Sequence, residues 1–285
     1  MVDHISVLLK EVVEFLEPKK GKKIIDATLG MGGHTRAFLE KGAVVLALEW
    51  DEQVLSQTKK HLSCPDASWK VALGNFADIE KIAKENGFVS AEAVFFDLGI
   101  STWHYKKSQR GFSFLDQSLD MRISRKTILT AEKIVNSASK EELAEIFSSL
   151  VQQNQAGKIA DRIIEKRPIR SAKKLEKTVK EVIGQSGKVN PATKVFLALR
   201  IAVNSEFDNL VSGLMGAVNL LETGGRLAVI SFHSGEDRIV KLYFKKLANL
   251  GKIKILTRKA VRPSKKEVDI NPSARSALLR VVEKT

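Results

Sequence analysis

The sequence predicts a doubly wound, Rossmann-like α/β fold: a mostly parallel sheet of about seven strands, interrupted by an inserted helical domain. Two observations lead to this prediction. Short apolar runs alternate with helical segments in the first hundred or so residues, and the same alternation returns after residue 205. Between these parts, residues 106–204 show helical spacing but no run typical of a strand.

The first part of the chain contains four strand-like runs separated by three helical segments. Strands are expected at 23–27, 43–48, 69–73 and 93–96, and helices at 35–41, 54–62 and 79–86. The run at 43–48 is apolar throughout and ends at Glu49, which is typical of a strand buried on both faces of a parallel sheet.

The remainder divides into a helical stretch and a second α/β stretch. Helical spacing is found at 140–150 and 157–166, and a long helical pattern covers 193–221. The alternation then resumes with a strand at 226–232, a helix at 238–250, and strands at 252–256 and 277–282 that a basic loop separates. We therefore expect a sheet domain formed by residues 1–105 and 205–285, and an inserted helical substrate-recognition domain formed by 106–204.

The charge of the chain points to a polyanionic partner. The 285 residues include 47 Lys and Arg against 33 Asp and Glu, a net charge of +14. This excess lies in 106–200, with 20 basic and 10 acidic residues, and in 251–285, with 10 and 3, whereas the rest has 17 and 20. A near-neutral core with two basic segments indicates nucleic-acid binding by the attached surfaces, and helices whose charge serves only solubility are the alternative.

Several classes of protein are excluded by composition. The longest uncharged stretch, 209–221, is too short to span a bilayer, and the N-terminus lacks the plan of a secretory signal, so we expect no membrane association and a cytoplasmic location. The one cysteine, Cys64, cannot form an internal disulfide. The five histidines show no zinc-ligand spacing, so no metal is expected.

A glycine-rich loop follows the first predicted strand, where open α/β sheets bind nucleotides. It reads Asp-Ala-Thr-Leu-Gly-Met-Gly-Gly-His over 26–34. The third glycine of a dinucleotide fingerprint is replaced by Thr35, which weakens an NAD assignment. Glu49 follows Gly30 by 19 residues, at the end of the second strand, where a carboxylate can accept hydrogen bonds from ribose hydroxyls.

The glycine turn alone is as often a purely structural turn, but its combination with Glu49 and with Asp97, after the fourth strand, favours a nucleoside cofactor. S-adenosyl-L-methionine fits better than NAD because it has no pyrophosphate to bind. Phe76, after the third strand, could pack against adenine or be an ordinary core aromatic.

The chemistry points to a nitrogen or oxygen acceptor. Methylation of a pyrimidine carbon calls for a cysteine nucleophile, and Cys64 falls in a predicted turn beside Pro65, far from the strand ends. A nitrogen or oxygen acceptor needs only alignment and a polar group that orients it, which Asp97 can supply. A loop or helix cap is the alternative for Asp97.

The chain strongly resembles the bacterial family of small-subunit ribosomal RNA cytosine-N4 methyltransferases, and the resemblance spans essentially its whole length. Besides the glycine loop, it is carried by seven segments: HISVLL at 4–9, DLGIS at 97–101, RGFSF at 110–114, LDMR at 119–122, ALRIAVN at 198–204, GGRLAVISFHS at 224–234 and NPSARSA at 271–277.

The resemblance implies a class I methyltransferase fold and methyl transfer from S-adenosyl-L-methionine to the exocyclic N4 of a cytidine in the decoding region of 16S rRNA. The partner would be 16S rRNA in the small ribosomal subunit or its late precursor, and a homodimer is left open. The implied cofactor contacts are Gly32, Gly33, His34, Glu49, Phe76, Asp97 and His104.

The chain departs from the family pattern at several positions. Glu49 stands where aspartate is usual, and Trp103 and His104 stand where Pro-Gln is usual. Other departures are Ser6, Asn190, Gly235 and Ser273. Glu49 keeps the carboxylate, whereas His104 exchanges an amide for an imidazole.

Three residues are expected to serve catalysis. Asp97 would border both cofactor and base, and Ser231 and His233, with Ser234, would shape the base pocket at the end of the fifth strand. A structural role is an equal alternative for His233. Basic side chains in 162–180, eight against two acidic, and a second set, Arg258, Lys259, Arg262, Lys265 and Lys266, are expected to contact rRNA phosphates.

Two other classes of protein remain as alternatives. A non-catalytic RNA-binding or assembly factor could keep the fold without binding cofactor. An NAD-dependent oxidoreductase is the weaker alternative because of Thr35.

Overall fold

The computed structural model describes residues 5–62, 68–184 and 189–285. The chain divides into two compact units, which are described separately below. We call Met1–Ile100 with Phe207–Thr285 the sheet unit, and Ser101–Glu206 the helical unit. Cys64 and Pro65, to which the sequence assigns a turn, lie outside the described residues.

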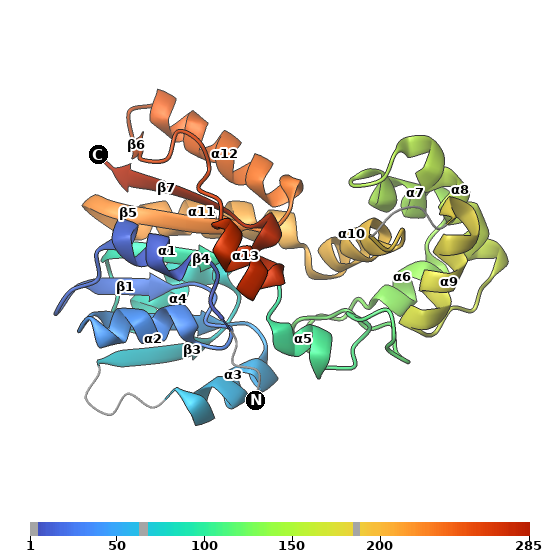
Figure 1. Cartoon of the computed structure of the whole chain (residues 1–285), viewed down its shortest axis with the longest axis horizontal. Helices are drawn as coiled ribbons and strands as arrows, with labels where there is room; N and C mark the ends of the chain where they lie inside the picture. The colour runs from blue at the N-terminus through green and yellow to red at the C-terminus, as the bar shows by residue number, and fades with distance from the viewer. Residues whose placement is uncertain (1–4, 63–67, 185–188) are drawn as a thin grey trace. The chain divides into compact units, whose positions relative to one another are not determined.

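The sheet unit contains a seven-stranded sheet in the order β3-β2-β1-β4-β5-β7-β6 (Figure 1). The strands from β3 to β5 pair in parallel, and β7 is antiparallel to both of its neighbours. Their bounds are β1 Lys23–Asp26, β2 Val44–Glu49, β3 Trp69–Leu73, β4 Ala91–Asp97, β5 Leu221–Ser231, β6 Ile253–Ile255 and β7 Leu278–Lys284. Because these strands are parallel, their carboxyl ends lie at one edge of the sheet. The strand order reverses between β1 and β4, and ligands of open α/β sheets bind at such a switch point.

Helices cover both faces of this sheet, which explains why its central strands are apolar on both sides. One core contains side chains of α1 (Leu9–Leu16), α2 (Gly33–Glu40) and α3 (Glu52–His61), together with strand residues such as Ile24 and Phe95. The other contains side chains of α4 (Ile79–Glu85), α11 (Glu206–Leu220) and α12 (Ser234–Asn249), together with Ile25 and Phe96. Adjacent strand residues therefore face opposite cores.

The helical unit has its own apolar core. Its helices are α5 Thr102–Lys106, α6 Ala131–Ser137, α7 Lys140–Ser148, α8 Gln153–Glu165, α9 Ala172–Ile183 and α10 Thr193–Asn204. Helix α8 packs against both α7 and α9. Phe147 of α7, Ile159 of α8 and Leu175 of α9 are fully buried. Helix α7 begins with a capping box in which Ser139 and Glu142 bond each other's backbone amides.

The structure differs from the sequence prediction in two segments. The helical pattern over 193–221 forms two helices, α10 and α11, because Ser205 takes a left-handed conformation with φ of 49° that ends α10. The predicted basic loop before β7 contains helix α13 (Lys265–Ile270) and the short 3₁₀ helix η2 (Pro272–Ser276). Ser264 caps α13 by accepting a hydrogen bond from the Glu267 amide.

No helix within the described residues has the length and apolar character needed to cross a membrane.

Candidate cofactor and active site

The loop after β1 is held in a tight turn by glycine geometry and side-chain bonds. Gly30 and Gly32 have φ of 51° and 80°, in the left-handed region that favours glycine. The Thr58 hydroxyl of α3 donates to the Gly30 carbonyl at 2.6 Å. A Cβ added to Gly32 would lie 3.0 Å from the Thr58 methyl group, so the loop packs directly on α3. The turn therefore has both a conformational and a packing reason for its glycines.

Gly33 begins α2 beneath the N-terminal segment. A Cβ at this position would lie 1.9 Å from the Ser6 hydroxyl oxygen, a distance that no side chain can occupy. The next residue, His34, is buried with Nε2 3.0 Å from the Val7 carbonyl oxygen and with its ring 4.5 Å from that of Phe95. Because a carbonyl only accepts, Nε2 of His34 carries a hydrogen. The residues before α1 thus cover the start of α2.

Glu49 joins the β1 loop to the carboxyl end of β2. Its Oε2 accepts a hydrogen bond from the Gly30 amide at 3.0 Å, and its Oε1 accepts one from the Asp51 amide at 2.8 Å. Burial raises the pKa of the Glu49 carboxyl to about 7. Each carboxylate oxygen has a second lone pair, so Glu49 can still accept hydrogen bonds from a diol.

Asp26 and Asp97 lie at the carboxyl ends of two adjacent strands. Asp26 accepts hydrogen bonds from the Thr35 hydroxyl at 2.6 Å and from the Thr28 amide at 3.1 Å. The Asp97 amide donates to the Thr28 hydroxyl at 2.6 Å, which ties β4 to the loop after β1. Burial raises the pKa of the Asp26 carboxyl to about 6.

The Asp97 side chain leaves one buried oxygen unsatisfied. Its Oδ1 has no hydrogen-bond partner within the part of the chain that the structure describes, and its Oδ2 lies 3.6 Å from Nδ1 of His34. Burial, and then the charges of Asp26 and Glu236, raise the pKa of the Asp97 carboxyl to about 8. A buried acceptor without a partner is rare in a folded protein, and this oxygen is available to a donor from a bound molecule.

We expect the ligand-free protein to lose stability as the pH rises from 6 to 8.5. The folded-state pKa values of Asp26, Glu49 and Asp97, at about 6, 7 and 8, lie above their ordinary values. The folded protein therefore retains protons that the unfolded chain has released, and this stabilisation disappears as the pH passes through the raised values. Denaturant unfolding at several pH values measures the effect, which we expect to be on the order of a few kcal/mol.

The matched variant for this experiment is Asp97→Asn, which removes the carboxyl group with the highest pKa of the three. Its stability should fall less steeply between pH 7 and 8.5 than that of the original chain. A stability that rises over this range in the original chain would contradict the assignment of the raised pKa values.

Phe76 lies in the 3₁₀ helix η1 (Phe76–Asp78), directly after β3. Its ring packs edge-to-face on Phe96 with centroids 5.5 Å apart, and a Cβ at Gly213 of α11 would lie 2.7 Å from it. Phe76 is thus in part a core residue, although its side chain remains half-buried. Contact with adenine remains a prediction.

The structure shows packing and capping roles for Ser231 and His233. Ser231 is 1% exposed, with Oγ 3.4 Å from the Leu278 carbonyl oxygen. His233 caps α12: its Nδ1 accepts from the Glu236 amide at 3.4 Å, while the Glu236 carboxylate accepts from the Phe232 and His233 amides. The role of these two residues in a base pocket remains a prediction.

His104 belongs to the helical unit and is described within it. It is 3% exposed, with Nδ1 3.1 Å from the Ser101 hydroxyl oxygen. Its ring lies 5.6 Å from that of Trp103 and 5.2 Å from that of Phe112. His104 is therefore part of an aromatic cluster, and its contact with a cofactor remains a prediction.

Sequence reasoning missed the residues that support the candidate site. Thr28 and Thr35 bond the strand-end aspartates, and Glu236 closes the cap that His233 begins. The spacing of His233 and Glu236 is that of a capping box, a signal that is present in the sequence. The bonds of Thr28 and Thr35 depend on which strands become neighbours.

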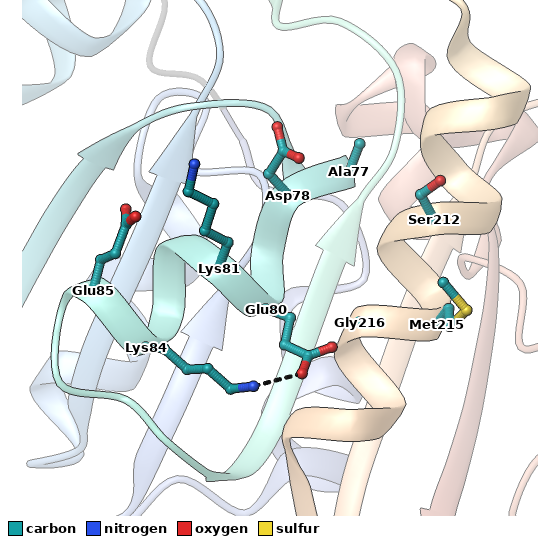
Figure 2. A pocket seen from close by; sticks show the side chains of 9 residues that line it. All are labelled: Ala77, Asp78, Glu80, Lys81, Lys84, Glu85, Ser212, Met215 and Gly216. Atoms are coloured by element: carbon teal, nitrogen blue, oxygen red, sulfur yellow. Dashed lines mark hydrogen bonds and ion pairs between the residues drawn. The ribbon is translucent and has the colours of Figure 1, made fainter.

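A separate groove of about 640 Å³ lies between α4 and α11 (Figure 2). Its lining comes from η1, α4 and α11 and includes an ion pair of 2.7 Å between Lys84 and Glu80. None of the strand-end residues described above lines this groove. It is therefore distinct from the candidate site.

The strand order, with its reversal between β1 and β4 and its single antiparallel strand β7, defines a class I methyltransferase fold. The glycine turn, Glu49 and Asp97 lie at the carboxyl edge of that sheet, where this class binds its cofactor. The chain belongs to the MraW methylase family, whose model matches residues 1–285.

Curated relatives match the chain over nearly its whole length. A protein of Thermotoga neapolitana named ribosomal RNA small subunit methyltransferase H is 41% identical, over 98% of this chain and 95% of its own. A protein of the same name from Thermomicrobium roseum is 40% identical, over 99% and 93%. A solved structure of an rRNA methylase from Streptococcus thermophilus is 15% identical over 99% of each chain, with a TM-score of 0.48. The fold assignment rests on the strand order.

Proposed function

We propose that this protein transfers a methyl group from S-adenosyl-L-methionine to the exocyclic N4 of a cytidine in the decoding region of 16S rRNA. The observation that carries the proposal is the buried edge where Glu49 binds the Gly30 amide and Asp97 keeps an unsatisfied oxygen. Family membership over the full chain supports the same reaction.

The residues at this edge fit a nucleoside cofactor. Glu49 is held by two backbone amides and retains lone pairs for ribose hydroxyls. The left-handed glycines at 30 and 32 expose loop backbone without a Cβ. S-adenosyl-L-methionine supplies, when bound, an electrophilic methyl group and a positive charge. A cation near Asp97 would lower the pKa of that carboxyl and favour its charged form.

Asp97 is the proposed catalytic residue. The lone pair of the cytosine amino group is delocalised into the ring, so the amine is a poor nucleophile and must be held in line with the group it attacks. The Asp97 carboxylate would accept a hydrogen bond from the amino N–H and orient it. The target base has to leave its stack to reach a carboxylate that is only partly exposed.

Within the first predicted RNA surface, we propose as RNA contacts only the exposed cations that have no partner within the described residues. Within 162–180, Arg162 pairs with Glu165 and Glu181, and Arg167 donates to the Val135 carbonyl, so these side chains support the helical unit. Arg170, Lys173 and Lys177 are exposed and form no ion pair with described residues. We propose that these three contact phosphates.

We propose all five cations of the second predicted surface as RNA contacts. It lies between β6 and β7 and includes part of α13. Its five cations are exposed and form no ion pair within the described ranges: Arg258, Lys259, Arg262, Lys265 and Lys266. A cluster of exposed cations without acidic partners supports binding to a polyanion.

We expect the triple variant Arg170→Gln, Lys173→Gln, Lys177→Gln to bind RNA more weakly and with a flatter salt dependence. The loss of three phosphate contacts should make the negative slope of log K against log salt shallower by about 2. Binding of labelled 16S rRNA fragments over a range of salt concentrations measures both quantities.

The control carries the same charge change on α12, as Lys241→Gln, Lys245→Gln, Lys246→Gln, at exposed positions outside the two proposed surfaces. It should change the slope less than the Arg170, Lys173 and Lys177 variant does. If that variant keeps the original slope, these cations do not contact RNA.

Cofactor binding and methyl transfer test the proposal. Calorimetric titration with S-adenosyl-L-methionine should show one site per chain, and purified small subunits that lack the modification should incorporate labelled methyl groups. A non-catalytic assembly factor would show neither result. A late-precursor substrate, a homodimer and a cytoplasmic location remain predictions.

A further inference from the structure

Helix α5 turns one aromatic side chain outward. Trp103 and His104 pack in the aromatic cluster of the helical unit, where the Arg110 guanidinium lies 5.4 Å from the Trp103 ring centre. Tyr105 is 49% exposed and is the only aromatic side chain among the exposed large hydrophobic residues within the described parts of the chain. The other aromatic side chains within the described residues are less exposed, so Tyr105 is the ring that a partner can reach most readily.

The Tyr105 hydroxyl contacts a buried ion pair between Arg200 and Glu206. Nη1 of Arg200 lies 3.5 Å from the Tyr105 hydroxyl oxygen, within the helical unit. The same guanidinium binds both carboxylate oxygens of Glu206 at 2.8 Å, and Arg200 is buried. A bidentate pair fixes the guanidinium plane. The position of the Tyr105 ring is therefore favoured before any partner binds, which reduces the entropy lost on binding.

Two free cations follow the ring. Lys106 and Lys107 are exposed, and neither forms an ion pair with a residue in the described ranges. An exposed aromatic ring with cations at the next two positions of the chain suits unpaired nucleotides, since a base can stack on the ring while the cations contact neighbouring phosphates. A protein-docking surface would more often combine the ring with further apolar side chains.

We propose that Tyr105 stacks on an unpaired base of the RNA substrate, with Lys106 and Lys107 on the adjacent phosphates. This inference rests on the proposed function and assigns a substrate-positioning role to a residue outside the cofactor edge. Stacking is tolerant of base identity, so Tyr105 contributes affinity and register rather than base selection.

The test measures binding of the full-length protein to a fluorescein-labelled single-stranded RNA of about ten nucleotides with the decoding-region sequence. Tyr105→Ala should weaken binding by about tenfold, while Tyr105→Phe, which keeps the ring, should stay within about twofold. The salt slope should remain unchanged in Tyr105→Ala but fall in Lys106→Gln, Lys107→Gln. Tyr105→Leu, which keeps apolar bulk without an aromatic face, should behave as the alanine variant does.

An abasic scan of the same RNA identifies the stacked base. Removing one particular base should weaken RNA binding by the original protein. Removing the same base should not weaken RNA binding by Tyr105→Ala any further. Equal affinity of the original, alanine and leucine variants, or an abasic effect that persists in full without the ring, would overturn the inference. Thermal unfolding checks that each variant folds.

The inference and the proposed function fail in different ways. If the original protein neither binds cofactor nor methylates small subunits, the proposed function fails. If it methylates them and the Tyr105→Ala variant binds RNA and turns over as the original does, only the stacking role fails. If Tyr105 serves a protein partner instead, its removal leaves RNA affinity unchanged.

Discussion

Asp97→Asn should lower the rate of methyl transfer by about 100-fold or more. We propose that the Asp97 carboxylate, which can only accept hydrogen bonds when charged, binds the amino N–H of the target base. Asparagine has nearly the same shape but presents an NH₂ group in place of one carboxylate oxygen. The substitution removes the negative charge and leaves a single neutral oxygen as the acceptor at this position, where Asp97 has an unsatisfied Oδ1. Single-turnover transfer of labelled methyl groups to small subunits measures the effect.

A structural explanation of that loss can be separated from a chemical one. The backbone amide of Asp97 bonds Thr28 and is unaffected by the substitution, so the loop after β1 should keep its position. Thermal unfolding should show a folded protein, and calorimetry reports cofactor affinity independently of turnover. Unchanged cofactor affinity together with unchanged turnover would remove Asp97 from the site.

Glu49→Gln should raise the Kd for S-adenosyl-L-methionine by about 10-fold to 100-fold. Both oxygens of Glu49 already accept backbone N–H groups, from Gly30 and Asp51. An amide has only one oxygen, so its NH₂ group must face one of these donors and leave it unpaired. The ribose would also lose charged acceptors. Calorimetric titration with S-adenosyl-L-methionine gives the Kd directly.

Glu52→Gln is the matched control, because Glu52 is an exposed residue in the first turn of α3. It makes the same chemical change three residues further along the chain. Glu49→Asp keeps the charge and should retain more affinity than Glu49→Gln. Cofactor affinity equal to that of the original chain in Glu49→Gln would refute the ribose assignment.

The parallel sheet was largely predictable because its strands are buried on both faces. The run 69–73 coincides with β3, and the run 43–48 lies within one residue of β2. Prediction failed where tertiary contacts override a local pattern. Ser205 interrupts a continuous helical pattern with a left-handed residue, and α13 is a short polar helix with no buried residue to give it a hydrophobic period.

The sequence predicts which residues of the site lie at the ends of strands. It does not predict which side chains they bond. Parallel pairing of β1 with β2 brings the loop after one strand to the end of the other, so the meeting of Gly30 and Glu49 follows from topology. The contact of His34 with Val7 and the ion pairs of Arg162 depend on packing between segments that no local pattern links. Because Arg162 forms these ion pairs, we leave it out of the proposed RNA surface.

The most direct test of the account is nucleoside mass spectrometry of 16S rRNA from cells with and without the gene. The account predicts that N4-methylcytidine in the decoding region is lost on deletion, restored by the original gene, and not restored by Asp97→Asn. Persistence of N4-methylcytidine after deletion, or full restoration by Asp97→Asn, would contradict it.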